Sequence, residues 1–183
     1  MIITPARDAD VATIMEWRRD LTQWLRGMGE DQWSVALPTS AVAATVSSGQ
    51  TWMVWDCEDP IATITLSAYE GLDNLWTSAV NAEALWTSQD DPADALYVAK
   101  MMVCRTRAGE NIGGEMLDWA GGRAFAAGLA WVRLDAWTTN PRLHDYYRSQ
   151  GFTHVRTVPT RPSGACFQRP SQPYTRGRLK TEV

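Results

Sequence analysis

The sequence predicts a single mixed α+β domain, and three observations indicate it. Short runs rich in β-branched and aromatic residues alternate with stretches whose apolar residues recur at helical spacing. The chain has 183 residues, 45% of them hydrophobic, and a domain of this size buries roughly 70% of the surface of its unfolded chain. Neither an internal repeat nor a linker interrupts it. We therefore expect one domain over residues 1–168 and a disordered basic tail at 169–183.

The first half of the chain is expected to form a strand, two helices and a hairpin. Residues 1–6 are expected to form the strand, and the apolar residues of 11–28 then recur at the spacing of an amphipathic helix. A weaker helical stretch covers residues 41–46. The β-rich runs 51–55 and 61–66 are separated by a short polar segment, which predicts two strands joined by a hairpin loop.

Residues 69–94 interrupt this order, because acidic residues, Asn, Ser and Pro stand between scattered apolar ones. Long loops in compact domains are frequently functional, so this segment either borders a site or is a plain surface insertion. The ten tryptophans leave a similar pair of alternatives. Those that precede residue 90 either line a pocket for a flat or greasy substrate or fill the core.

The second half begins with a strand that is expected to be buried on both faces. Residues 96–103 are apolar except for Lys100, which is typical of such a strand. A helix follows at 112–127, in which Gly121 and Gly122 predict a close approach of the helix to the sheet.

A second helix is expected to begin at Asn140 and Pro141, since Asn caps free amides and Pro fits the first helical position. Gly151 ends it. The last three strands are expected at 131–137, 152–158 and 165–168.

Composition and charge exclude several classes of protein. The chain has 17 basic and 21 acidic residues, a net charge of −4, so nucleic acid is not an expected partner. Three cysteines about 50 residues apart match neither a disulfide framework nor a zinc site, and two isolated histidines add no metal site. No run of ~18 apolar residues and no signal peptide is present, so we expect a cytoplasmic protein without a membrane segment.

Residues 95–128 have the order strand, glycine-bearing turn and helix, which is typical of a phosphate site. Backbone N–H groups and the positive end of the helix dipole converge in such a turn. A Walker loop would need Gly-Lys-Ser/Thr at the helix start, but the chain has Gly113, Gly114 and Glu115, which excludes a nucleotide hydrolase. The glycine spacing is also wrong for a dinucleotide fold. A structural turn without a ligand is the remaining alternative.

Residues 103–113, with the sequence VCRTRAGENIG, resemble the coenzyme A loop of the GCN5-related N-acetyltransferases (GNAT). The pattern of that family is Arg/Gln-x-x-Gly-x-Gly/Ala after a central strand. In this register Ala108 replaces the leading Arg/Gln, Asn111 replaces the first glycine, and Gly113 matches the last. Asn tolerates positive φ better than most residues, so the backbone amide hydrogen at position 111 can still point into the loop. Arg105 or Arg107 would replace the missing cation.

A second motif makes the resemblance more specific. Residues 140–152, with the sequence NPRLHDYYRSQGF, are similar to the closing motif of that family: Asn at a helix start, Tyr four residues before Gly, then Phe opening a strand. The resemblance extends over nearly the whole chain to about residue 168, without 69–94. It implies a GNAT fold, with a central twisted, mostly antiparallel sheet of about six to seven strands flanked by about four helices.

The resemblance implies acetyl-CoA as co-substrate, and a backbone N–H near Met102 or Val103 would stabilise the oxyanion formed during transfer. It also assigns the residues that contact acetyl-CoA. These are Met101, Met102, Val103, Ala108, Gly109, Glu110, Asn111, Ile112, Gly113, Gly114, Asn140 and Tyr147.

The resemblance makes Tyr147 the catalytic acid that protonates the departing thiolate. Two alternatives stay open: the Tyr147 hydroxyl bonds to backbone in the core, or Tyr146 is the acid. An alkylammonium acceptor must also lose a proton before it attacks. The base is left open among the acids that end the central strand or lie in 69–94, namely Glu70, Asp73, Glu83, Asp90, Asp91, Asp94 and Asp135.

Two functions follow from these residues. The first is an N-acetyltransferase that moves acetyl from acetyl-CoA to a primary amine, by direct attack in a ternary complex and without a metal. A small-molecule amine is the expected acceptor, because the tryptophan-bearing first half and residues 69–94 could enclose one. The alternative is a CoA-binding sensor or regulatory module without catalysis. A homodimer is left open as the assembly.

Overall fold

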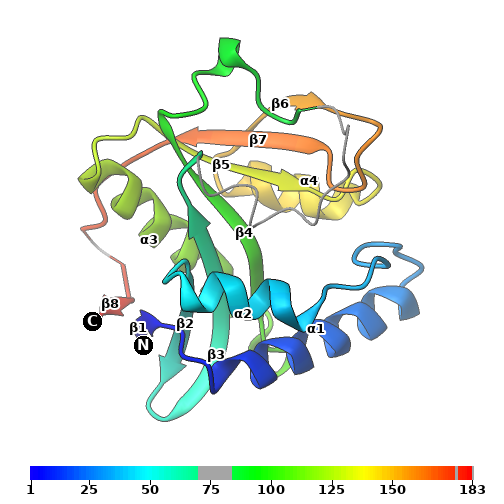
Figure 1. Ribbon diagram of the computed structural model, residues 1–183, viewed down its shortest axis with the longest axis vertical. Helices are drawn as coiled ribbons and strands as arrows, with labels where there is room; N and C mark the ends of the chain where they lie inside the picture. The colour runs from blue at the N-terminus through cyan, green and yellow to red at the C-terminus, as the bar shows by residue number, and fades with distance from the viewer. Residues whose placement is uncertain (70–83, 176, 183) are drawn as a thin grey trace.

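The computed structural model describes residues 1–69, 84–175 and 177–182 of the chain. In this part the chain folds into one eight-stranded sheet with the strand order β6-β7-β5-β4-β3-β2-β1-β8, and four α-helices pack on it (Figure 1). The predicted mixed fold is confirmed. The sheet has eight strands rather than six to seven, because the last residues of the chain add a short strand at its edge.

The helices and strands lie close to their expected positions. The helices are α1 (Asp10–Gly27), α2 (Thr39–Ser47), α3 (Ile112–Ala126) and α4 (Pro141–Ser149). The strands are β1 (Ile2–Pro5), β2 (Thr51–Asp56), β3 (Asp59–Ser67), β4 (Ala95–Val103), β5 (Trp131–Ala136), β6 (Thr153–Thr157), β7 (Ala165–Pro170) and β8 (Lys180–Thr181).

The two faces of the sheet carry different helices, as the alternation of side chains along β2 shows. Trp52 and Val54 belong to the cluster that α3 and α4 cover, whereas Met53 between them belongs to the cluster formed with α1 and α2. Successive side chains of a strand point to opposite faces, so each face buries its own apolar set. In Figure 1, α1 and α2 lie side by side across one part of the sheet, away from α4.

The sheet opens at its centre, between β4 and β5. These two strands are parallel, and their pairing runs from Ala95 opposite Trp131 to Val98 opposite Leu134. Beyond this point the described part of β4 pairs only with β3, while the end of β5 pairs only with β7. The carboxyl ends of the two central strands therefore diverge.

A β-bulge in β4 lies just beyond the last pair with β5. Ala99 pairs with Thr65 and Met102 pairs with Thr63, so Lys100 and Met101 together stand opposite one residue of β3. Lys100 has a φ of 48°, a conformation that is rare for a residue with a side chain. Because of the extra residue, Ala99 and Met102 lie on the same face of the sheet although three positions separate them.

Part of the 69–94 segment lies outside the described residues, and the described part packs as core. Leu85 and Trp86 are buried against Tyr97 on the face opposite α3. The buried Arg133 guanidinium donates to the backbone carbonyls of Asp90 and Asp91, the latter at 3.1 Å. This end of the segment is therefore held to the sheet by a desolvated cation.

The expected disordered tail differs from the structure, in which residues beyond 169 pack on α3. The Tyr174 hydroxyl donates to Glu115 at 3.2 Å and accepts from the Leu179 amide at 2.8 Å, and Leu179 is buried. A Cβ on Gly122 would come within 2.4 Å of the Tyr174 Cβ. Gly122 thus permits the close approach of this C-terminal segment, not of the sheet. The basic residues of this segment predict a solvated tail, but Tyr174 and Leu179, which stand among them, are the residues that pack.

None of the helices within the described residues is both long and apolar enough to span a bilayer.

Candidate active site

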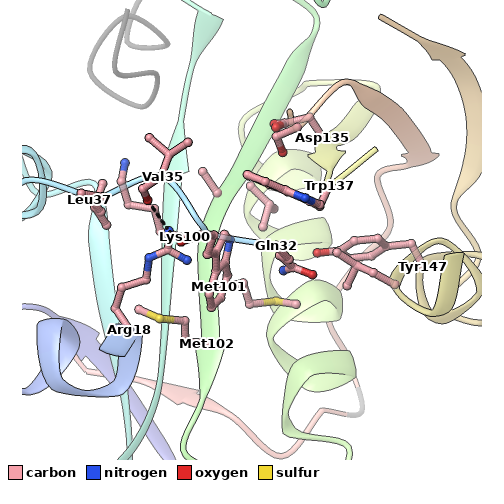
Figure 2. Close-up of a pocket in the computed structure, with 16 residues that line it drawn as sticks. Arg18, Gln32, Val35, Leu37, Lys100, Met101, Met102, Asp135, Trp137 and Tyr147 are labelled. Atoms are coloured by element: carbon pink, nitrogen blue, oxygen red, sulfur yellow. Dashed lines mark hydrogen bonds between the residues drawn. The ribbon is translucent and has the colours of Figure 1, made fainter. Parts of the chain in front are cut away.

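Two cavities meet at the bulge of β4, and both are lined by Met101 and Met102. The first, of about 460 Å³, is called the loop cavity because the turn before α3 forms it. The second, of about 210 Å³, is called the inter-strand cavity because it lies where β4 and β5 diverge (Figure 2). The divergence of the strands thus places a second cavity beside the one at the glycine-bearing turn.

The loop cavity brings together most of the predicted acetyl-CoA contacts. It is lined by Met101, Met102, Val103, Arg107, Ala108, Gly109, Asn111, Ile112, Gly113 and Tyr146. Among the predicted contacts, Glu110, Gly114, Asn140 and Tyr147 are not among its lining residues.

Backbone amides of this turn are available to an anion. The Ala108 and Glu110 amides donate to carbonyls of the short 3₁₀ helix Arg105–Arg107, and the Glu115 amide donates to Asn111. The remaining amides have no hydrogen-bond partner within the described residues; they belong to Gly109, Asn111, Ile112, Gly113 and Gly114. Unpaired amides at a helix start attract phosphate groups by direct donation and by the helix dipole.

Asn111 takes the conformation that the family glycine would supply. Its φ is 58° and its ψ is 25°, in the left-handed region, directly before the first residue of α3. Gly113 is also required to be small, because a Cβ there would come within 2.5 Å of the Tyr146 hydroxyl. The turn keeps its shape although the sequence departs from the family pattern at Asn111.

Replacing Asn111 with valine is expected to destabilise the protein by about 1–2 kcal/mol and to weaken acetyl-CoA binding, because a β-branched residue resists the left-handed conformation. Asn111→Gly is the matched control and should keep both properties. Thermal unfolding with and without acetyl-CoA measures both. Equal affinity in the valine and glycine variants would show that the left-handed turn does not matter for binding.

Side-chain charge in the loop cavity is largely neutralised. Arg107 lines the cavity, but its guanidinium pairs with Glu110 at 2.7 Å and with Asp56 at 2.9 Å, and hydrogen bonds to these two carboxylates raise the pKa of Arg107. Arg105 stacks on Trp24, 3.8 Å from the ring centroid. Recognition of an anion here therefore depends mainly on the backbone.

The segment between α1 and α2 closes one side of the inter-strand cavity. The Asp31 carboxylate accepts hydrogen bonds from Trp137 Nε1 at 2.8 Å and from the Thr139 hydroxyl. Both bonds lower the pKa of Asp31, and the bond from Thr139 has the larger effect. Beside it, Gln32 accepts from Asn140 Nδ2 at 2.6 Å. These bonds tie the segment to the end of β5 and to the start of α4.

The side chain of Asn140 caps a helix and contacts a neighbouring segment. Its side-chain oxygen accepts from the Leu143 amide at 3.0 Å and caps α4, as the sequence predicts, while its nitrogen donates to Gln32. Asn140 is buried and lines neither of the two cavities. Its connection to the site runs through Gln32, which lines the inter-strand cavity.

Tyr147 and Tyr146 lie on different sides of the site. Figure 2 shows the Tyr147 hydroxyl pointing into the inter-strand cavity, while its ring packs on Phe152 and Phe167. Burial raises the pKa of Tyr147 above its usual value, so the phenol is protonated at neutral pH. Tyr146 instead lines the loop cavity against Gly113, and burial raises its pKa to about 12.

Asp135 is the one described candidate base that lines this site. It lies at the end of β5 in the inter-strand cavity, and burial raises its pKa to about 7 against the opposing hydrogen bond from Ser163. Lys100, in the bulge, lines the same cavity; burial lowers its pKa to about 8, and the charge of Asp135 opposes the shift. Two titrating groups of opposite charge thus face one small cavity.

The other candidate acids are engaged elsewhere or lie outside the described residues. Asp90 pairs with Arg156 and accepts from Thr87, and Asp94 accepts from the Ala130 amide at 2.8 Å. Asp91 is exposed. The acids at positions 70, 73 and 83 fall in the part that is not described.

Sequence reasoning missed Arg18, Lys100 and Trp137 as lining residues of the inter-strand cavity. Only Lys100 had a local signal, as the single charge in an apolar strand. In the described residues, no three His, Cys, Asp or Glu side chains gather as they would at a metal ion.

Comparison with known proteins finds similar chains, although no family model matches this one. A Bacillus subtilis (strain 168) protein named uncharacterized N-acetyltransferase YesJ is 24% identical over 151 residues, which cover 81% of this chain and 79% of that protein. An acetyltransferase of the GNAT family from Listeria monocytogenes 4b F2365 has a similar solved structure, with a TM-score of 0.66 and 18% identity over 92% of this chain and 94% of that one.

A second similar structure is the PaiA N-acetyltransferase from Thermoplasma acidophilum in complex with coenzyme A. Its TM-score is 0.63 and its identity 14%, over 92% of this chain and 97% of that one. These structures show that the chain has the fold of GNAT acetyltransferases. Together with YesJ they confirm the predicted resemblance to that family, and they support the prediction that the protein is an acyltransferase.

Proposed function

We propose that this chain, whose fold is that of the GCN5-related N-acetyltransferases, transfers acetyl from acetyl-CoA to a primary amine of a small molecule. One observation carries the proposal: the loop cavity and the inter-strand cavity share Met101 and Met102. A thioester that reaches these residues from the loop cavity would meet an amine held in the other cavity. Both substrates would then react in one ternary complex, without an acetylated enzyme intermediate.

The pyrophosphate of acetyl-CoA would lie at the turn Ala108–Gly114. The unpaired amides of the turn and the start of α3 supply the donors. The coenzyme A complex of the Thermoplasma acidophilum relative supports acetyl-CoA as the co-substrate.

Asp135 would act as the general base. A carboxylate with a pKa of about 7 is half ionised at neutral pH, and it can accept the proton that a neutral amine loses as its nitrogen attacks the thioester. The amine nitrogen then bonds to the thioester carbonyl carbon, and the oxygen becomes an oxyanion. A backbone N–H of β4 near Met102 or Val103, at the bulge, would stabilise that oxygen.

Tyr147 would act as the general acid. As the tetrahedral intermediate collapses, the carbon–sulfur bond breaks and the CoA thiolate takes the phenolic proton. The buried phenol stays protonated at neutral pH, and no hydrogen bond within the described residues occupies its hydroxyl. The proton that Asp135 gained returns to Tyr147 through solvent, so the enzyme is restored.

The size of the inter-strand cavity supports a small acceptor. Its volume of about 210 Å³ lies below the range of roughly 300–1,000 Å³ that is typical of drug-sized ligand sites. The bonds of Asp31 and Gln32 to the neighbouring elements cover one side of it. A protein chain would have less room to enter there than a single small amine.

Acetyl-CoA at 100 times its Kd is expected to stabilise the protein by ~2.7 kcal/mol, and the protein is expected to release thiol when a suitable primary amine is added. Differential scanning fluorimetry and a thiol-reactive dye measure the two effects. Stabilisation without thiol release over a broad amine panel would favour the non-catalytic CoA-binding module. Absence of both effects would contradict the proposed function.

A further inference from the structure

Arg18 of α1 faces the inter-strand cavity and is held in place by the segment between α1 and α2. Its guanidinium lies over the Trp33 ring, 4.1 Å from the ring centroid. Its Nη2 donates to the backbone carbonyls of Trp33 and Val35, each at 3.4 Å. Figure 2 shows the side chain reaching from α1 toward the cavity. An arginine oriented in this way has little freedom left to lose when it binds a ligand.

The charge of Arg18 has no carboxylate partner within the described residues. Its Nη1 is buried and has no hydrogen-bond partner in this part of the chain. Burial lowers the pKa of Arg18 to about 10, and no acid of the described part of the chain opposes this shift. A desolvated cation without a counter-ion is costly to the folded state, and an anionic ligand group would supply the missing acceptor.

The charges that line the cavity are arranged in a way that selects the acceptor. Among the described residues that line it, Arg18 and Lys100 are basic and Asp135 is acidic. In Figure 2, Arg18 lies on one side of the cavity, and Asp135 and Tyr147 lie on the other. A small acceptor whose amine lies at Asp135 therefore has Arg18 facing it from the other side of the cavity.

We infer that the acceptor carries a carboxylate and that Arg18 binds it, so that the substrate class is amino acids with apolar side chains. The planar fork of arginine matches both oxygens of a carboxylate. Leu37, Trp137 and Leu143 are apolar lining residues of the same cavity, which suits an apolar side chain. The inference rests on the proposed acetyl transfer, and it adds the part of the substrate that does not react.

The test compares acceptors that differ only in the carboxylate. Thiol release from acetyl-CoA is measured with L-leucine and L-phenylalanine and with the corresponding amines, isopentylamine and phenethylamine. We expect kcat/KM of the unmodified protein to be about 30-fold or more higher for the amino acids, as for other buried charge pairs. Arg18→Gln should remove this preference, mainly through KM, and leave kcat/KM for the two amines within about twofold.

Arg19→Gln is the matched control, because Arg19 is exposed on the same helix and the change in charge is the same. It should leave both activities unchanged. An equal loss with amino acids and amines in Arg18→Gln would overturn the inference, since Arg18 would then only hold the segment of Trp33 and Val35.

Two further outcomes separate this inference from the proposed function. Transfer by the unmodified protein that is equal for the two classes, or better with the simple amines, would overturn the carboxylate site and leave acetyl transfer intact. No transfer to any of the acceptors, with acetyl-CoA still bound, would overturn both. If Arg18→Gln does not fold, equal transfer to the two classes by the unmodified protein would still overturn the inference, and Arg18→Lys, which keeps the charge and loses the planar fork, takes the place of the glutamine variant and should lower the preference for amino acids.

Discussion

Asp135→Asn is expected to lower kcat/KM for acetyl transfer by about 10²-fold or more at pH 8, because an amide cannot accept the proton of the acceptor. The unmodified protein should show a step in kcat/KM near pH 7, where Asp135 becomes ionised, on top of the gradual rise that follows the fraction of free amine. In the variant this step should be absent, and the rate should keep rising with pH as more free amine forms. Initial rates of thiol release across pH 5.5–9 (about one point per half unit) provide the measurement.

The loss should not result from unfolding. The pKa of Asp135 is about 7 in the folded protein and ~3.9 in an unfolded chain, so the folded state binds more protons between these values. Stability therefore falls as pH rises through this window, and at pH 8 the neutral amide should be at least as stable as the carboxylate. Asp91→Asn, the same change at an exposed acid, is the control that should keep full activity. A retained pH step in Asp135→Asn would identify another group as the base.

Tyr147→Phe is expected to reduce kcat by about 10²-fold and to leave acetyl-CoA affinity nearly unchanged. The removed hydroxyl points into the inter-strand cavity, while the ring contacts with Phe152 and Phe167 remain, so the fold should persist. Burial raises the pKa of Tyr147, so the unmodified protein should not lose activity through its ionisation below pH 9. Steady-state rates and acetyl-CoA binding, measured together, test this.

Tyr146→Phe is the matched comparison for the acid. Tyr146 lies in the loop cavity against Gly113, so its hydroxyl is placed to affect acetyl-CoA binding more than the chemical step. A small change in kcat is expected for this variant. If Tyr146→Phe slowed kcat and Tyr147→Phe did not, the roles of the two residues would be reversed.

The loop cavity could be predicted from the sequence because its signals are local. An apolar strand, a turn with glycines and a helix follow one another within 95–128, and Asn111 takes the left-handed conformation that its residue type tolerates. The cap and first residue of α4, Asn140 and Pro141, are equally local. Such features depend on residues that are neighbours in the sequence, so a sequence pattern can predict them.

The inter-strand cavity depends on contacts between distant segments, which no local pattern encodes. The bulge at Lys100 arises from the pairing of β4 with β3, and Arg18 reaches the cavity only because α1 packs beside β4. Asp135 was one of seven candidate acids, and only its position at the diverging strand end distinguishes it from the other described ones. The added strand β8 also went unnoticed, because two residues carry too little pattern.

The most direct test of the central claim is a crystal structure of the protein with coenzyme A. The claim predicts phosphate oxygens within hydrogen-bond distance of the unpaired amides between Gly109 and Gly114, and the thiol beside Met101 and Met102, where the two cavities meet. Coenzyme A bound away from this turn, or with its sulfur remote from the inter-strand cavity, would contradict it.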